Sequence, residues 1–129
     1  PGMEYGFHVD DPIMKGSRTD LSFTLFLTDP ETYEGGELVV HAAGMTQAIK
    51  GQAGELVLYP SASIHEVRPV TQGARIVCVG WIESRIQRAD QREILFDLES
   101  TRAALPKGTR EQKLILDKTI SNLIRMWAS

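Results

Sequence analysis

The sequence has little of what marks a secreted or membrane protein. It has one cysteine, Cys78, so the chain cannot form an internal disulfide. We expect Cys78 to be a small buried residue of a strand. The lack of disulfides favours a cytoplasmic protein. No apolar run approaches the roughly 20 residues that a membrane-spanning helix needs. The 129 residues contain neither a secretory signal nor a basic targeting tract. We therefore expect no membrane partner.

A concentration of positive charge is also missing. Acidic side chains outnumber basic ones 17 to 14, which gives a net charge of −3. The basic residues are interleaved with acidic ones at helical spacing and form no basic patch or stripe. This pattern argues against a nucleic-acid partner.

The first two thirds of the chain has the pattern of short β-strands separated by turns. In Leu21–Thr28, apolar and polar positions alternate, and the loop that follows runs from Asp29-Pro30 to Gly35-Gly36. Short strands of this kind, regularly separated by turn signals, predict an all-β sandwich or barrel rather than βαβ units. The predicted strand segments are 5–9, 21–28, 37–41, 46–50, 55–59, 64–70 and 75–83.

After Glu83 the apolar spacing becomes helical, and Pro106-Lys107-Gly108 divides the segment into two amphipathic helices. Thr109, with Gln112 three residues later, has the form of a capping box at the start of the second helix. We predict a β domain over residues 1–84 and a helical extension over residues 85–129 that packs on its outside. The apolar stripe that ends at Trp127 is alternatively the seam of a homodimer.

Histidine is scarce, which narrows the search for a metal site to His8, His41 and His65. In a strand, His8 and Asp10 would point to the same side, about 6–7 Å apart along the backbone. His65 opens a later predicted strand. Two histidines and one carboxylate form the triad that leaves coordination positions open on iron(II). His41 is interpreted as an exposed strand-end histidine.

Arg75 lies ten positions after His65, at the start of the last predicted strand. That strand is apolar on both sides, so we expect it to be central and buried. A buried guanidinium costs several kcal/mol unless it is paired. The partner is then either an acid from a loop, such as Asp20 or Glu55, or the carboxylate of a ligand, which an arginine fork suits.

Three stretches of this sequence together resemble a known family, the bacterial PKHD-type hydroxylases. These are iron(II)- and 2-oxoglutarate-dependent dioxygenases related to prolyl 4-hydroxylases. The most specific stretch runs from His65-Glu66-Val67-Arg68-Pro69 through Arg75 to Trp81. The other two are Tyr5-Gly6-Phe7-His8-Val9-Asp10 and Gly35-Gly36-Glu37-Leu38, and the resemblance extends through the helices to Trp127.

The resemblance implies a double-stranded β-helix, or jelly-roll, of eight core strands. His8, Asp10 and His65 would bind Fe(II), and Arg75 would hold the distal carboxylate of 2-oxoglutarate. No catalytic side chain is implied beyond these metal ligands. Tyr5 and Phe26 are weaker candidates for the co-substrate pocket, and each is as easily explained as part of the core.

The function that the resemblance implies is hydroxylation of a small-molecule or protein substrate with O₂ and 2-oxoglutarate, with release of succinate and CO₂. Ascorbate is a candidate additional cofactor. Members of the family are longer at the N-terminus, so we expect a truncated dioxygenase whose jelly-roll lacks its first strand. Two alternatives remain: a cupin-type barrel with another metal and no keto acid, and an inactive fragment that acts as an interaction module.

Overall fold

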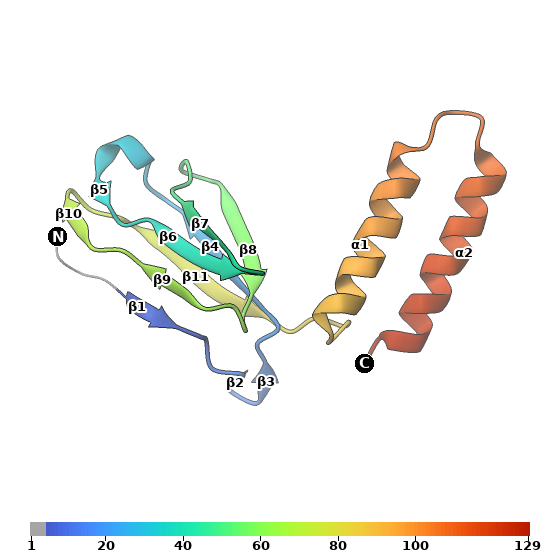
Figure 1. Ribbon diagram of the computed structural model, residues 1–129, viewed down its shortest axis with the longest axis horizontal. Helices are drawn as coiled ribbons and strands as arrows, with labels where there is room; N and C mark the ends of the chain where they lie inside the picture. The colour runs from blue at the N-terminus through green and yellow to red at the C-terminus, as the bar shows by residue number, and fades with distance from the viewer. Residues whose placement is uncertain (1–4) are drawn as a thin grey trace. The chain divides into compact units, whose positions relative to one another are not determined.

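The computed structural model describes residues 5–129, except for the side chain of Tyr5. The chain divides into two compact units, one that ends at Glu83 and one that comprises Ser84–Ser129. Figure 1 shows that the first unit consists mainly of strands and the second of two helices. Within residues 5–129, none of the helices combines the length and the apolar character needed to cross a membrane.

Two antiparallel sheets and two short strand pairs build the first unit (Figure 1). One sheet has the order β1-β9-β6-β7, the other has the order β11-β4-β8, and the short pairs are β10-β5 and β2-β3. The unit has the predicted jelly-roll fold, and each of the predicted strand segments overlaps a strand. The strands are β1 Tyr5–His8, β2 Ile13–Met14, β3 Ser17–Arg18, β4 Leu21–Phe26, β5 Glu34–Gly35, β6 Leu38–Ala42, β7 Met45–Ile49, β8 Leu56–Pro60, β9 His65–Val67, β10 Val70–Gln72 and β11 Val77–Ile82, with a 3₁₀ turn at Pro30–Thr32.

Strand β4 buries its polar side chains instead of its leucines. Ser22, Thr24 and Phe26 are buried, whereas Leu21, Phe23 and Leu25 are only half-buried. Ser22 and Thr24 line a pocket between the two sheets, so the inner face of this strand carries polar groups toward that pocket. The predicted alternation is therefore confirmed, and it directs the hydroxyl groups of Ser22 and Thr24 toward the pocket.

The prediction of a central, fully buried last strand is wrong. Strand β11 pairs only with β4 among the described strands, which puts it at the edge of its sheet, and Arg75 lies just before the strand. Val79 is 57% exposed and Ile76 is 54% exposed. Cys78, predicted to be buried, is exposed as well. The strand is apolar on both sides because one side lines the pocket and the other is the outer face of the sheet.

The second unit is the predicted pair of amphipathic helices, α1 Ala89–Ala104 and α2 Arg110–Trp127. They pack against each other around a small apolar cluster that includes Ile86 from the segment before α1. An isolated antiparallel β-bridge pairs Ile86 with Ala128, so the segment before α1 lies beside the residue that follows α2. The other members of the cluster are Leu95, Leu98, Ile120, Leu123 and Trp127.

The capping-box prediction for α2 is correct in position and wrong in chemistry. Thr109 is the N-cap residue, as predicted, but its side chain makes no capping hydrogen bond. Its hydroxyl donates instead to the backbone oxygen of Pro106, at 2.6 Å. The Thr109 hydroxyl therefore bonds to the preceding turn and not to the first N–H groups of the helix, as threonine side chains often do.

Candidate metal centre

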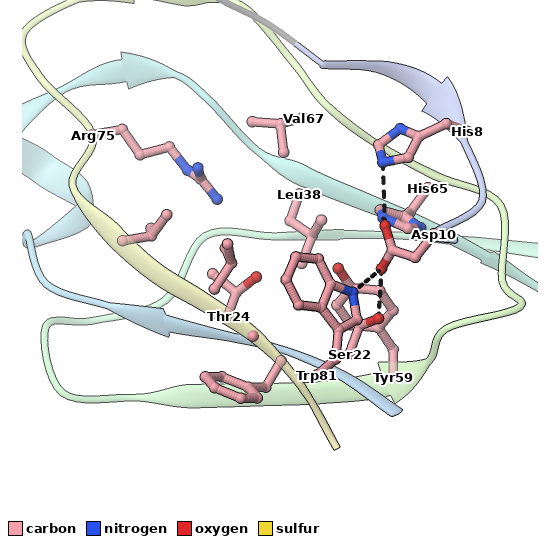
Figure 2. A pocket seen from close by; sticks show the side chains of 14 residues that line it. His8, Asp10, Ser22, Thr24, Leu38, Tyr59, His65, Val67, Arg75 and Trp81 are labelled. Atoms are coloured by element: carbon pink, nitrogen blue, oxygen red, sulfur yellow. Dashed lines mark hydrogen bonds and ion pairs between the residues drawn. The ribbon is translucent and has the colours of Figure 1, made fainter. Parts of the chain in front are cut away.

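The three residues predicted as metal ligands come together at one end of the pocket. His8 ends β1 and His65 begins β9, and these two residues are register partners in the antiparallel sheet. Asp10 follows β1 by two residues. One ligand atom from each of the three side chains lies within 4.8 Å of the others (Figure 2). His65 is buried, Asp10 is half-buried and His8 is exposed, so the cluster has an inner and a solvent-facing side.

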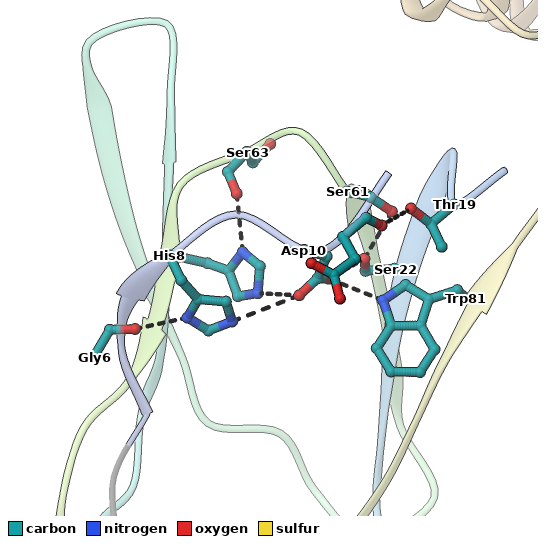
Figure 3. Close-up of polar contacts among 10 residues, drawn as sticks. Gly6, His8, Asp10, Thr19, Ser22, Ser61, Ser63 and Trp81 are labelled. Carbon is teal, nitrogen blue, oxygen red and sulfur yellow. Dashed lines mark hydrogen bonds and ion pairs between the residues drawn. The ribbon is translucent and has the colours of Figure 1, made fainter. Parts of the chain in front are cut away.

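Both imidazoles are held so that the same nitrogen faces the carboxylate (Figure 3). Nδ1 of His8 lies 2.6 Å from the backbone oxygen of Gly6, and Nδ1 of His65 lies 2.9 Å from that of Ser63. A carbonyl can only accept, so each Nδ1 carries the proton and donates it. The Nε2 atoms then offer lone pairs, and they lie 3.5 and 3.3 Å from Oδ1 of Asp10. A backbone acceptor that orients a ligating histidine in this way is typical of metal sites.

Asp10 is held as a carboxylate by groups from the opposite sheet. Its Oδ2 accepts hydrogen bonds from Ser22 Oγ at 2.5 Å and from Trp81 Nε1 at 3.0 Å. Burial is the largest influence on the pKa of Asp10 and raises it. The hydrogen bonds from Ser22 and Trp81, with the charges of His65 and His8, outweigh burial, so the pKa lies below its usual 3.8. The site therefore offers two imidazole nitrogens and one ionised carboxylate, a donor set that suits iron(II).

The lowered pKa of Asp10 predicts a specific acid sensitivity of the metal-free protein. A carboxyl whose folded-state pKa is depressed stabilises the fold fully above the unfolded pKa, here 3.8, and loses this contribution as pH falls through the folded value. Melting temperatures measured without metal between pH 6 and pH 3 should therefore fall more steeply for the parent than for Asp10→Asn. Parallel curves for the two proteins would show that the carboxylate gains nothing from its hydrogen bonds.

Arg75 lies near the other end of the pocket without an acidic partner (Figure 2). Across residues 5–129 no carboxylate lies within ion-pair distance of it, and its Nε is buried without a hydrogen-bond partner. The loop acids considered as partners are engaged elsewhere: Asp20 lies 3.4 Å from Arg18, and Glu55 accepts from the backbone of Gln52. The guanidinium is therefore available to a ligand.

The surroundings of Arg75 hold it in place without neutralising it. Burial lowers the pKa of Arg75, and the neighbouring Tyr33 opposes this, yet the Tyr33 hydroxyl is itself buried without a hydrogen-bond partner. The guanidinium lies 5.9 Å from the ring centre of Phe26, a cation–π distance. A Cβ added at Gly36 would come 2.9 Å from Cδ of Arg75, so only glycine lets the arginine stem pass. These contacts position a cation whose charge remains unpaired.

The pocket between the two sheets has a volume of about 420 Å³ and joins the metal candidates to Arg75. His8, His65 and Leu38 line it from one sheet, and Tyr59 and Thr24 line it from the other. Its walls are mainly apolar, which strengthens interactions between the few charged groups inside. The volume and the lining suit a small acid that reaches from the metal site to the guanidinium.

The two weaker sequence candidates have different outcomes. The side chain of Tyr5 lies outside the described part of the chain. Phe26 is a buried core residue that supports Arg75 through its ring, and a Cβ added at Gly51 would collide with it. The sequence allowed Phe26 to be either a pocket residue or a core residue, and the structure places it in the core. Phe26 contributes to the pocket only indirectly, through its contact with Arg75.

Sequence reasoning missed Tyr59 and did not foresee that Ser22 and Trp81 would bind Asp10. The ring of Tyr59 packs edge-on against His65, with ring centres 4.9 Å apart. Burial and the Asp10 charge raise the pKa of Tyr59, while Thr24 and Arg75 oppose them, so the phenol keeps its proton at neutral pH. Ser22 and Trp81 bind Asp10 rather than a co-substrate. One available signal was the shared face of Arg75, Val77, Val79 and Trp81, which directs Trp81 into the pocket.

A jelly-roll with two histidines and a carboxylate at one end of its pocket is the arrangement found in non-haem iron oxygenases. A sequence model described as the 2OG-Fe(II) oxygenase superfamily matches residues 1–83. The chain belongs to this superfamily. It is 53% identical to a PKHD-type hydroxylase of Maricaulis maris over 98% of its length, and 48% identical to one of a Picosynechococcus species over 99%.

Two solved structures resemble the fold. A prolyl 4-hydroxylase of Pseudomonas putida matches 66% of this chain and 47% of its own, with a TM-score of 0.53 and 31% identity. An oxidoreductase of the 2OG-Fe(II) oxygenase family from Burkholderia pseudomallei matches 60% and 36%, with a TM-score of 0.51 and 26% identity. The chain spans 59% of the length of the two PKHD-type relatives. Membership in this superfamily, which implies iron(II) and 2-oxoglutarate, does not favour the cupin-type barrel or the interaction module.

Proposed function

We propose that the β unit is a dioxygenase domain in which His8, Asp10 and His65 hold Fe(II). The observation that carries this proposal is the shared direction of three ligand atoms: both Nε2 atoms face Oδ1 of Asp10 at 3.5 Å or less. Each Nδ1 is bound by a backbone oxygen, so neither imidazole needs to turn before it can bind a cation. The ionised carboxylate supplies the negative charge that a divalent cation needs.

We further propose that Arg75 binds the distal carboxylate of 2-oxoglutarate. Its unpaired guanidinium lies in the same pocket as the metal ligands and offers the planar donor fork that suits a carboxylate. The apolar walls exclude water around the ion pair, and Thr24 and Tyr59 are the polar side chains between the two ends. A dicarboxylate would thus be bound by charge at one end and by the metal at the other.

With iron(II) and 2-oxoglutarate bound, the site would supply oxidative chemistry in which O₂ converts 2-oxoglutarate to succinate and CO₂ and a substrate C–H to C–OH. One oxygen atom enters succinate and the other enters the hydroxyl group, so atoms and electrons balance. The protein's part is to place the two reactants and keep water out. We propose a small-molecule or protein substrate, ascorbate as the reductant that keeps the metal ferrous, and a reducing compartment such as the cytoplasm. A homodimer is a further proposal.

Conversion of 2-oxoglutarate to succinate tests this function without knowledge of the substrate. The protein with Fe(II), ascorbate and O₂ should form succinate without its main substrate, as followed by NMR, because ascorbate can supply the two electrons that the substrate C–H bond would otherwise give. The reaction should depend on both iron and O₂. A folded, iron-loaded protein that binds 2-oxoglutarate but forms no succinate above the level of free iron would contradict the proposed reaction.

A further inference from the structure

The two oxygens of Asp10 lie in different surroundings (Figure 3). Oδ1 faces the Nε2 atoms of His8 and His65. Oδ2 faces away from them and accepts two hydrogen bonds, from Ser22 and from Trp81. A carboxylate oxygen has about two lone-pair sites, so these two donors occupy Oδ2 and leave Oδ1 free to bind a cation.

The two donors are fixed as one unit of the opposite sheet. Ser22 on β4 and Trp81 on β11 are register partners, so they face Asp10 from one rung of the ladder. Ser22 is buried, and its one hydroxyl hydrogen points to Asp10. The contact of 2.8 Å between Ser22 Oγ and Ser61 Oγ must then be donated by Ser61. Ser61 thereby fixes the direction of the Ser22 hydroxyl.

Ser61 also holds the backbone of Asp10. Its carbonyl oxygen accepts a hydrogen bond from the Asp10 backbone N–H at 3.4 Å, and its own N–H donates to the backbone oxygen of Asp20 at 3.2 Å. The backbone and the carboxylate of Asp10 are therefore both connected to Ser61. This arrangement resists rotation of the carboxylate about its own axis, the motion that would bring Oδ2 toward the histidines.

From these contacts we infer that Ser22 and Trp81, with Ser61 behind them, are positioning residues that restrict Asp10 to one metal-binding oxygen. The inference rests on the proposed metal site. It adds that this site leaves three coordination positions open on the metal. Two imidazoles and one carboxylate oxygen fill three of six positions on iron(II), and a second oxygen from Asp10 would fill a fourth. A chelating keto acid needs two positions and O₂ needs one, so Oδ2 must stay off the metal.

Counting metal-bound water molecules with Mn²⁺ tests this inference without 2-oxoglutarate or turnover. Water-proton relaxation by bound Mn²⁺ scales with the number of coordinated waters, which is three if Asp10 binds through one oxygen. In the double variant Ser22→Ala with Trp81→Phe, Oδ2 is free to bind, so the relaxation per bound Mn²⁺ should fall by about one third. The affinity for Mn²⁺ should fall about 10- to 100-fold, as it does when outer partners of metal ligands are removed.

Two matched variants control for general effects of the substitutions. Ser17→Ala removes an exposed hydroxyl of β3, outside the pocket, and Trp127→Phe changes the other tryptophan, in the helical unit. Both should give the parent's relaxation. Trp81→Phe alone keeps an aromatic side chain and the Ser22 hydrogen bond but removes the N–H donor, so it should show a smaller fall in the same direction if the double variant does not fold.

The outcomes separate this inference from the proposed function. A double variant that folds, binds Mn²⁺ and relaxes water as the parent does would overturn the positioning role while leaving the metal site intact. A parent that binds no Mn²⁺ would overturn the proposed metal site, and the positioning role with it.

Discussion

Replacing Asp10 with alanine is expected to abolish Fe(II) binding. The carboxylate is the one anionic member of the cluster, and it lies within 3.5 Å of the Nε2 atoms of both histidines. Removal of an outer partner of a metal ligand costs about 10- to 100-fold in affinity, so loss of the anionic ligand itself should cost at least about 100-fold. Anaerobic titration calorimetry measures this loss directly. His8→Ala should likewise lose iron binding.

Asp11→Ala is the matched control for Asp10→Ala. Asp11 is the adjacent acid, its side chain is exposed, and it is not part of the cluster that could hold a metal. Its substitution removes the same charge one residue away, so Fe(II) affinity should stay within about twofold of the parent's, because surface charges act weakly through water. Equal losses for the two variants would mean that net charge, and not ligation by Asp10, holds the iron.

Replacing Arg75 with alanine is expected to weaken 2-oxoglutarate binding strongly while Fe(II) binding is retained. Removing one partner of a buried, hydrogen-bonded ion pair costs about 2–5 kcal/mol, which corresponds to at least about a 30-fold rise in the dissociation constant. Arg75 contributes nothing to the metal cluster, so the affinity for iron alone should not change. Titration of the iron-loaded protein with 2-oxoglutarate measures the effect.

Arg68→Ala provides the comparison for Arg75→Ala. The Arg68 side chain is half exposed, and its nearest acidic partner is Glu66 at 3.9 Å, outside the pocket. This variant should bind 2-oxoglutarate as the parent does. Arg75→Lys keeps the charge without the planar fork, so it should recover part of the affinity. An unchanged affinity of Arg75→Ala for 2-oxoglutarate would mean that Arg75 does not bind the co-substrate.

The predicted strands and the pairing of His8 with Asp10 could be read from the sequence, because both depend on local spacing. His-x-Asp brings two side chains to one side of an extended segment. His65 was added as the third member by the resemblance to the PKHD-type hydroxylases, with Arg75 ten positions after it. The hydroxyls of β4 were placed on the correct face for the same reason. These features need only the period of a strand and the chemistry of each side chain.

The contacts that organise the site depend on pairings between distant segments and could not be predicted. Trp81 and Asp10 are 71 residues apart in the sequence. The register of β11 against β4 places Trp81 beside Ser22, and both side chains reach Asp10 from the sheet opposite to β1. The burial of the last strand was mispredicted because an apolar pocket wall and an apolar core give the same pattern. The Thr109 hydroxyl can bond either to the helix N-terminus or to the preceding turn, and a capping motif does not say which of the two it will contact.

The central claim is that one pocket binds iron and 2-oxoglutarate together, and the absorption spectrum tests it most directly. Addition of Fe(II) and 2-oxoglutarate to the protein without oxygen should produce a visible metal-to-ligand charge-transfer band, which arises only when the keto acid chelates the iron. The band should be absent in Asp10→Ala and should need more 2-oxoglutarate in Arg75→Ala. A folded parent protein that binds iron and shows no band at saturating 2-oxoglutarate would contradict the account.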